Sequence, residues 1–192
     1  MQKSIFYKIP LSRPDITRLE KNAVLSVLST PYLSLGPRIK EFEAKISTYI
    51  GIKYAIAVSN RTCGLHLIIR ALGIKDGDEV ITTPFSFTSS PNCILYERAK
   101  PVFVDIDPLT LNIDPTKIER AITKMTKAIL VVDNFAYPAD WDKLQKIARK
   151  YDLKLIEDSA EALGSEYKGK KCGTFAEAGI FSFYPNKQIT CG

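Results

Sequence analysis

Short apolar runs alternate with helical patterns along most of this chain, and no other feature of the sequence limits the possible folds as strongly. The apolar runs are expected to form buried strands at residues 54–58, 79–82, 102–105, 128–132, 154–157 and 180–183. Helical patterns separate most of these runs. The alternation therefore predicts an α/β fold, with a largely parallel sheet and helices on both of its faces.

Five amphipathic patterns predict the helices. Asp15 is the expected N-cap of the first, Thr62 that of the third and Asp114 that of the fourth, while the second begins near Arg38. The apolar faces are expected at Ile16, Leu19, Ala23 and Val27; at Ile39, Phe42, Ile46 and Ile50; at Leu65, Ile68, Ile69 and Leu72; at Ile118, Ala121 and Ile122; and at Leu144, Ile147, Ala148 and Tyr151.

The bulk properties suit either one globular domain or one domain with a short appendage, because the chain has 192 residues and 45% of them are hydrophobic. We place the boundary between a helical segment at residues 1–52 and a larger domain at residues 53–192. No apolar run is long enough to span a bilayer, and residues 1–10 lack the apolar stretch of a signal peptide. A cytoplasmic protein without membrane contact is therefore expected.

Cysteine and histidine usage argues against several kinds of site. The four cysteines lie far apart, and His66 is the only histidine, so no metal site and no disulfide framework are expected. The net charge of +6 indicates either a lysine-rich solvated surface or a field that attracts an anion such as a phosphate. Nucleic-acid binding is not expected, because no basic cluster is interleaved with aromatic residues.

Ligands of parallel α/β sheets bind beyond the carboxyl ends of the strands, so the residues that follow each run are candidates for a site. They are residues 59–62, 84–87, Asp133, Asp158 and residues 184–187. A hydroxyl-rich helix start, an aromatic side chain, a carboxylate and a lysine would thus converge on one edge. This set suits a phosphorylated aromatic cation.

Each candidate residue has an ordinary explanation beside the functional one. Lys187 is either a desolvated amine suited to Schiff-base formation or a surface lysine in a loop. Asp158 either keeps a pyridine nitrogen protonated or caps a turn. Thr62 either begins an anion-binding helix terminus or is only an N-cap. Ser182 either adds a hydroxyl to the same anion or alternates within its strand, and Phe87 either stacks on a ring or fills core.

Several segments together resemble the DegT/DnrJ/EryC1/StrS family of sugar aminotransferases, which has the type I fold of pyridoxal 5′-phosphate (PLP) transferases. The segments are YLSLGPRIKEFE (32–43), GDEVITTPFSF (77–87), AKPVFVDIDPLTLNIDP (99–115), YPADWDKL (137–144), EDSAEALGS (157–165) and FSFYPNKQITCG (181–192). Their joint order and spacing are more specific than any one motif. The resemblance covers almost the whole chain, and its residues 53–192 would be the PLP-binding large domain.

The resemblance implies PLP as cofactor and Lys187 as the Schiff-base lysine and proton carrier. The implied cofactor-binding residues are Arg61, Thr62, Phe87, Asp158, Glu161, Ser182 and Lys187, with Asp158 at the pyridinium, Thr62 and Ser182 at the phosphate, and Phe87 stacked on the ring. The implied reaction moves an amino group from an amino acid, usually glutamate, to a nucleotide-linked keto-sugar. Family members are dimers, so a homodimer is expected.

Three features depart from the family's pattern. Arg61 stands where members usually have glycine; its bulk opposes close approach of the backbone to the phosphate, whereas its charge could pair with that phosphate. Glu161 replaces a common glutamine. Members are about twice as long, so the chain is expected to be an N-terminal large-domain portion without the C-terminal small domain.

Two other functions stay open at this stage. One is a catalytically inactive dimerising or regulatory relative that keeps the fold, as the shorter length and Arg61 suggest. The other is a nucleotide-binding α/β domain unrelated to PLP, although the sequence has neither a G-x-G-x-x-G nor a Walker pattern.

Overall fold

The computed structural model describes residues 12–191, so the predictions for residues 1–10 and for the terminal glycine lie outside it. The helices are α1 (Arg18–Leu28), α2 (Pro37–Ile50), α3 (Arg61–Ala71), α4 (Ser89–Tyr96), α5 (Pro115–Ile118) and α6 (Trp141–Tyr151), with 3-10 turns at Glu119–Ala121 and Asn134–Ala136. The strands are β1 (Glu79–Thr82), β2 (Lys100–Phe103), β3 (Thr126–Val132), β4 (Lys154–Asp158), β5 (Glu166–Tyr167), β6 (Lys170–Lys171) and β7 (Ala178–Ile180). Within residues 12–191, no helix combines the length and apolarity that crossing a membrane requires.

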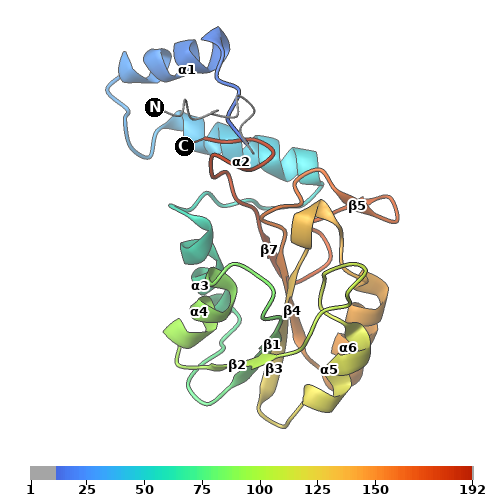
Figure 1. Cartoon of the computed structure of the whole chain (residues 1–192). Coiled ribbons are helices and arrows are strands. Elements are labelled where there is room, and N and C mark those ends of the chain that lie inside the picture. Colours follow the sequence, from blue (N-terminus) through green and yellow to red (C-terminus); the bar gives the residue numbers. More distant parts are fainter. Residues whose placement is uncertain (1–11, 192) are drawn as a thin grey trace, which may run out of the picture.

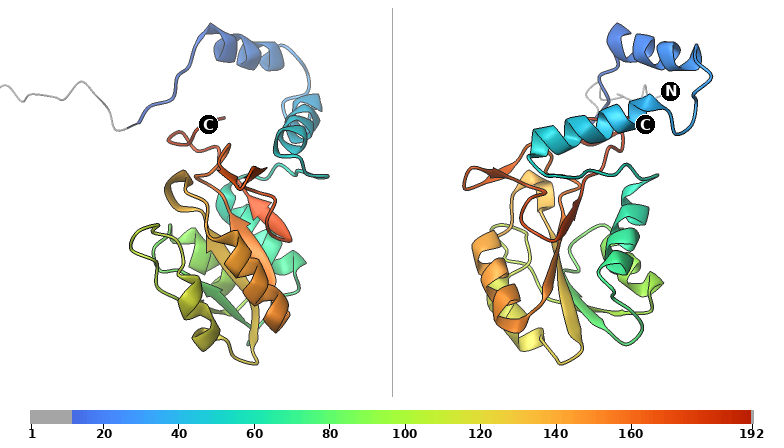
Figure 2. Two further views of the ribbon diagram at one scale, coloured as in Figure 1. Left: turned by 90° about the vertical axis from the view of Figure 1, so that its right-hand side faces the viewer. Right: turned by 180° about the vertical axis from the view of Figure 1, so that it is seen from behind.

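Five strands form one sheet in the order β2-β1-β3-β4-β7, and every neighbouring pair is parallel (Figure 1). Helices α3 and α4 cover one face of this sheet, and α5 and α6 cover the other (Figure 2). Strands β5 and β6 make a separate antiparallel hairpin. The predicted fold class, a largely parallel sheet with helices on both faces, is confirmed.

Alternating side chains along the strands build a core on each face of the sheet. In β3, Ile129 and Val131 belong to the cluster that contains Trp141 of α6, whereas Leu130 belongs to the cluster that contains Leu65 of α3. Each of these five side chains is 0% exposed. Because burying a large apolar side chain stabilises a fold by roughly 1.5–3 kcal/mol, the two clusters hold the helices on the sheet.

The two N-terminal helices lie outside this layered core. Thr17, not Asp15, is the N-cap of α1: its hydroxyl accepts from the Leu19 N–H, and the Glu20 carboxylate accepts from the Thr17 N–H. This reciprocal pair outcompetes Asp15 as a cap. Helix α1 buries none of its residues, and Leu19 is 77% exposed, so its predicted apolar face has no core to enter in the described chain.

Helix α2 lies beside the segment that follows β7 (Figure 1). The rings of Phe42 and Phe183 meet edge to face with centroids 5.0 Å apart. This contact holds α2 close to the part of the chain that carries Lys187.

Three strand predictions need correction. Residues 54–58 are irregular, and Ile56 is 79% exposed, because an apolar alternation forms a strand only where a neighbour pairs with it. Strand β2 starts and ends two residues before the predicted 102–105. Strand β7 ends at Ile180, where the 180–183 prediction begins, since its partner β4 ends at Asp158 and the pairing stops there.

Candidate active site

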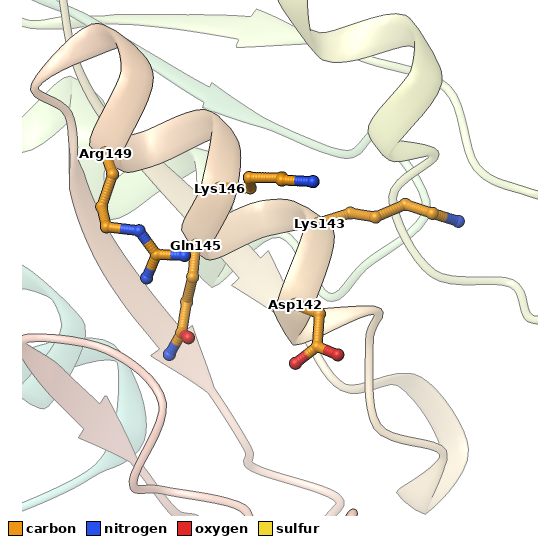
Figure 3. Close-up of a pocket in the computed structure, with 5 residues that line it drawn as sticks. All are labelled: Asp142, Lys143, Gln145, Lys146 and Arg149. Carbon is orange, nitrogen blue, oxygen red and sulfur yellow. The ribbon is translucent and has the colours of Figure 1, made fainter.

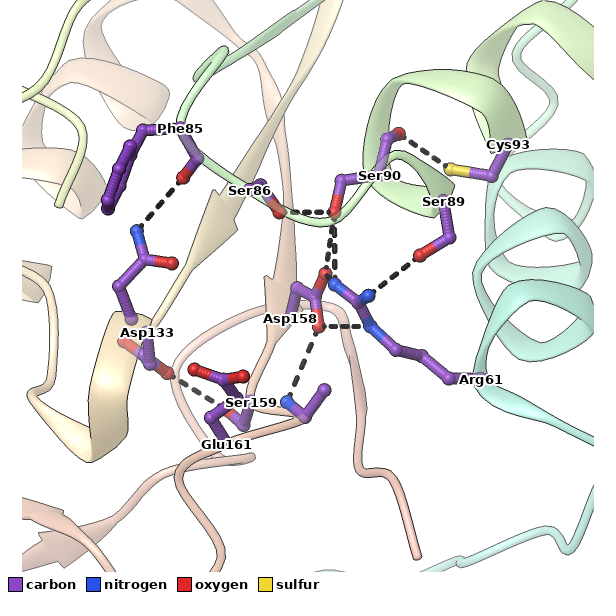
Figure 4. Close-up of polar contacts among 12 residues, drawn as sticks. Arg61, Phe85, Ser86, Ser89, Ser90, Cys93, Asp133, Asp158, Ser159 and Glu161 are labelled. Carbon is purple, nitrogen blue, oxygen red and sulfur yellow. Dashed lines mark hydrogen bonds and ion pairs between the residues drawn. The ribbon is translucent and has the colours of Figure 1, made fainter. Parts of the chain in front are cut away.

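The side chain of Asp158 is the buried centre of the site. It ends β4, is 0% exposed and points to the face that α3 and α4 cover (Figure 4). Its oxygen Oδ2 accepts a hydrogen bond of 2.9 Å from the Ser90 hydroxyl, and Oδ1 accepts one of 3.4 Å from the Ala160 N–H. A carboxylate in this setting is held in place by neutral donors and can take a cationic partner.

Arg61 is that cationic partner in this structure. Its Nε donates to Oδ1 of Asp158 at 2.9 Å, and its Nη2 donates to Oδ2, so the contact is two-pronged. The same guanidinium donates to the hydroxyls of Ser89 at 2.7 Å and Ser90 at 3.0 Å. Arg61 is thus bound to β4 and to the start of α4 at once (Figure 4).

Sequence reasoning missed Ser89 and Ser90. The signal was present, because residues 88–90 are three consecutive hydroxyl residues that follow the loop after β1. They resemble the start of α3, which was singled out for the same reason. A second hydroxyl-rich helix start at the same sheet edge marks this part of the site.

Helix α3 brings Arg61 and Thr62 to the site in its first turn. Asn60, not Thr62, is its N-cap, since the Asn60 side chain accepts from the Cys63 N–H and already satisfies that donor. Gly64 lets the helix approach β7 closely, because a Cβ there would lie 2.4 Å from Cδ1 of Ile180. The N-terminus of α3 is therefore fixed against the strand that leads to Lys187.

Lys187 and Glu161 form the second half of the site. The Lys187 amine lies 2.9 Å from Oε1 of Glu161, and the Phe135 N–H donates to Oε2 at 3.1 Å. The Lys187 side chain is 16% exposed. Partial burial by itself raises the pKa of Glu161, but the hydrogen bonds from Lys187 and Phe135 and the charges of Lys187 and Arg61 lower that pKa overall. Glu161 therefore stays ionised beside the amine.

The remaining predicted residues lie around these two groups. The Phe87 ring is 71% exposed, and its centroid lies 5.9 Å from Cζ of Arg61. Ser182 is partly buried just beyond β7, and its hydroxyl accepts from the Tyr184 N–H at 3.4 Å. The structure thus joins Arg61 to Asp158 and Lys187 to Glu161 by direct contacts, with Phe87 in contact range of Arg61.

A second acidic group lies on the opposite face of the sheet. Sequence reasoning named Asp133 only as a residue that follows a strand, and it did not single out Glu157. Asp133 and Glu157 are both 0% exposed, and the Ser159 hydroxyl lies 2.8 Å from an oxygen of each. Burial raises the pKa of both acids, and the nearby charge of Asp133 helps to raise that of Glu157 to about 7. Cys172 completes a buried trio whose potential ligand atoms lie within 4.8 Å of one another.

The two carboxylates of this trio already accept hydrogen bonds from protein donors. Asp133 accepts from the Ala139 N–H and the Trp141 indole, and Glu157 accepts from the N–H groups of Gly173 and Phe175. These donors lie in two segments, residues 139–141 and 173–175, which the acids bind to the sheet, so we assign the pair a structural role.

The surface hollow drawn in Figure 3 lies elsewhere. It measures about 270 Å³ and is lined only by α6, through Asp142, Lys143, Gln145, Lys146 and Arg149. Side chains of one solvated helix face do not converge on a ligand, so this hollow adds nothing to the site.

The structure is a parallel α/β fold, and a carboxylate, a guanidinium and an amine form a charged candidate site at the carboxyl edge of its sheet. The sequence profile described as the DegT/DnrJ/EryC1/StrS aminotransferase family matches residues 14–192. The chain belongs to this family.

Similar proteins agree with this assignment. The chain is 50% identical over 184 residues to uncharacterized protein MJ1066 of Methanocaldococcus jannaschii, covering 96% of this chain and 48% of that protein. It is 43% identical over 185 residues to GDP-perosamine synthase of Escherichia coli O157:H7, covering 96% and 51%. The chain therefore spans about half the length of the curated relatives that it matches.

Solved structures show the same arrangement. The PLP form of Spr1654 from Streptococcus pneumoniae superposes with a TM-score of 0.92 at 35% identity, covering 96% of this chain and 51% of that one. PseC of Helicobacter pylori, an aminotransferase involved in the biosynthesis of pseudoaminic acid, superposes with a TM-score of 0.92 at 36% identity, covering 96% and 50%. The chain thus matches a part of the fold of these aminotransferases.

Proposed function

We propose that this chain is the PLP-binding part of an aminotransferase that moves an amino group from an amino acid, with glutamate as the expected donor, to a nucleotide-linked keto-sugar. The observation that carries the proposal is the buried Asp158 carboxylate at the same sheet edge as the Lys187 amine, within a family of aminotransferases. The substrate class follows from relatives named GDP-perosamine synthase and PseC.

The residues present fit PLP. A buried carboxylate that neutral donors hold in place suits the protonated nitrogen of a pyridine ring, and Asp158 is such a group. The first turn of α3 offers backbone N–H groups and the Thr62 hydroxyl to a phosphate, and Ser182 would add another hydroxyl. Phe87 presents an exposed ring for stacking. One adjustment is required, because Arg61 now occupies the Asp158 carboxylate.

The side chains would divide the work as follows. When bound, PLP supplies an electron sink that stabilises a carbanion at Cα of the donor amino acid. Asp158 would hold the positive charge of the ring nitrogen. Lys187 would carry the cofactor and move a proton at Cα of the donor amino acid. Glu161 orients the Lys187 amine through the 2.9 Å contact.

Covalent labelling tests the proposal. Treatment of the protein with PLP and then borohydride is expected to add a pyridoxyl group at Lys187, which peptide mass spectrometry locates. Lys187→Ala should abolish the adduct, whereas Lys168→Ala should not, because Lys168 is an exposed hairpin residue paired with Asp142. Wild-type protein that stays unlabelled at saturating PLP would refute the cofactor assignment.

A second candidate function has one observation in its favour. Arg61 takes the contact that the cofactor would need, and this contact costs nothing in a catalytically inactive dimerising or regulatory relative that keeps the fold. Labelled protein that releases no keto acid from glutamate or any other amino acid would favour this function. The homodimer, the cytoplasmic location and the division at residue 52 stay predictions.

A further inference from the structure

Arg61 saturates the carboxylate on which the proposed cofactor depends. The two side chains are 11% and 0% exposed, so the ion pair is shielded from water. Oδ1 of Asp158 receives the Arg61 Nε and the Ala160 N–H, and Oδ2 receives the Arg61 Nη2 and the Ser90 hydroxyl. With two donors on each oxygen, the carboxylate has no position left for the N–H of a pyridinium ring.

The guanidinium also occupies the space between the proposed ring contacts. It lies 5.9 Å from the centroid of the Phe87 ring, the side chain proposed to stack on the cofactor, while it is bound to Asp158. Arg61 is planar and cationic, as a protonated pyridine ring is, and both prefer an aromatic face and a carboxylate edge. Arg61 therefore contacts both Phe87 and Asp158, the two side chains that the cofactor ring would contact.

We propose that Arg61 acts as a built-in competitor of the cofactor and sets its affinity. Without PLP, the Arg61 guanidinium occupies the Asp158 carboxylate. When PLP binds, the ring N–H replaces the guanidinium at that carboxylate. This inference rests on the proposed function. The exchange requires a rotation of the Arg61 side chain and the loss of its contacts with the Ser89 and Ser90 hydroxyls.

The predicted effect is tighter binding when Arg61 is removed. In Arg61→Gln without PLP, the buried Asp158 carboxylate has no charged partner, which destabilises the cofactor-free protein. The ring N–H of PLP supplies that partner, so PLP should bind more tightly to this variant than to the wild type. We expect the dissociation constant of PLP to fall by at least about tenfold in Arg61→Gln. PLP absorbance and fluorescence titrations of the full chain measure it. Arg61→Met, which keeps the length without the charge, serves if Arg61→Gln does not fold.

The matched control is Arg70→Gln. Arg70 lies on the same helix, is 71% exposed and pairs with Glu97, so its removal changes the same charge without touching Asp158. Its dissociation constant for PLP should equal that of the wild type within about twofold. An unchanged or weaker affinity in both Arg61 variants would overturn the inference.

Thermal unfolding without PLP gives a readout that does not depend on cofactor chemistry. Arg61→Gln and Asp158→Asn should each lower the Tm, and the double variant should lose less than the sum of the two, as partners of one buried pair do. Additive losses would count against the pair. If neither wild type nor variants take up PLP at Lys187, the proposed function itself fails; uptake with unaltered affinity removes only the role of Arg61.

Discussion

At the scale of single residues, Glu161 is the charged group that contacts Lys187. Its carboxylate oxygen lies 2.9 Å from the amine, and burial, which alone would raise the pKa of Glu161, is outweighed by the hydrogen bonds from Lys187 and Phe135. Glu161 therefore holds the amine in place through a charged contact.

Glu161→Gln should loosen this contact. The amide keeps a hydrogen-bond acceptor for Lys187 but removes the ion pair, so the rate of PLP attachment at Lys187 is expected to rise by up to about fivefold. The effect is limited because the Glu161 side chain is 38% exposed and solvent screens the pair. Borohydride trapping at successive times after PLP addition measures the rate. Glu166→Gln, in the exposed hairpin strand β5, is the control, and a rate shared by all three proteins would rule the effect out.

Sequence patterns predicted which residues belong to the candidate site, but not which contacts those residues make. Lys187, Asp158 and Glu161 were singled out because they lie in recognisable segments that follow strands. The partner of Arg61 was not predicted, because its choice between a phosphate and a carboxylate depends on Ser89 and Ser90, which only the packing of α4 against α3 brings within reach.

At the scale of elements, glycines set how β7 reaches the site. Gly173 has φ +94°, a left-handed conformation, and a Cβ there would lie 2.5 Å from Cζ of Phe181. Its N–H donates to Glu157. The turn before β7 therefore requires glycine at position 173, because a side chain there would collide with Phe181 and would strain the left-handed backbone.

Gly173→Ala should be markedly destabilising, by about 2–4 kcal/mol, because the left-handed backbone and the collision with Phe181 both oppose it. Gly169→Ala is the matched control. Gly169 has φ +77°, but no atom lies within 4 Å of a Cβ placed there, so only the backbone cost of about 1 kcal/mol is expected. Urea unfolding monitored by circular dichroism compares them. Equal losses in the two variants would show that the Phe181 contact costs nothing.

The same scale shows which strands a sequence can reveal. Strands β1, β3 and β4 were predicted to within two residues at each end, because each is buried over most of its length and carries consecutive apolar residues. Residues 54–58 have a similar composition but no neighbouring strand. Pairing is a property of the whole sheet, so local pattern cannot supply it.

At the scale of the whole molecule, the buried acids link the stability of the fold to pH. Burial first, and then the charge of Asp133, raise the pKa of Glu157 from 4.5 to about 7. Between these values the unfolded chain has released a proton that the folded chain retains. The free energy of unfolding therefore loses a contribution as pH rises from 4.5 to 7, by about 3 kcal/mol in all.

Glu157→Gln should remove this loss, because an amide mimics the protonated acid at every pH. Urea unfolding at several pH values is expected to show the variant gaining on the wild type between pH 4.5 and pH 7, with a constant difference above that range. Glu41→Gln, on the exposed side of α2, changes one carboxylate without entering the core. A Glu157→Gln curve parallel to that of the wild type would mean that Glu157 is ionised in the folded state throughout.

Consecutive residues of β4 serve opposite sides of the molecule: Glu157 ties down the loops over one face, and Asp158 reaches the ligand side of the other. Inserting or deleting a single residue upstream in this strand would turn each of these two side chains to the opposite face of the sheet. Length variation among descendants of this sequence should consequently accumulate in the connecting loops and spare these five positions.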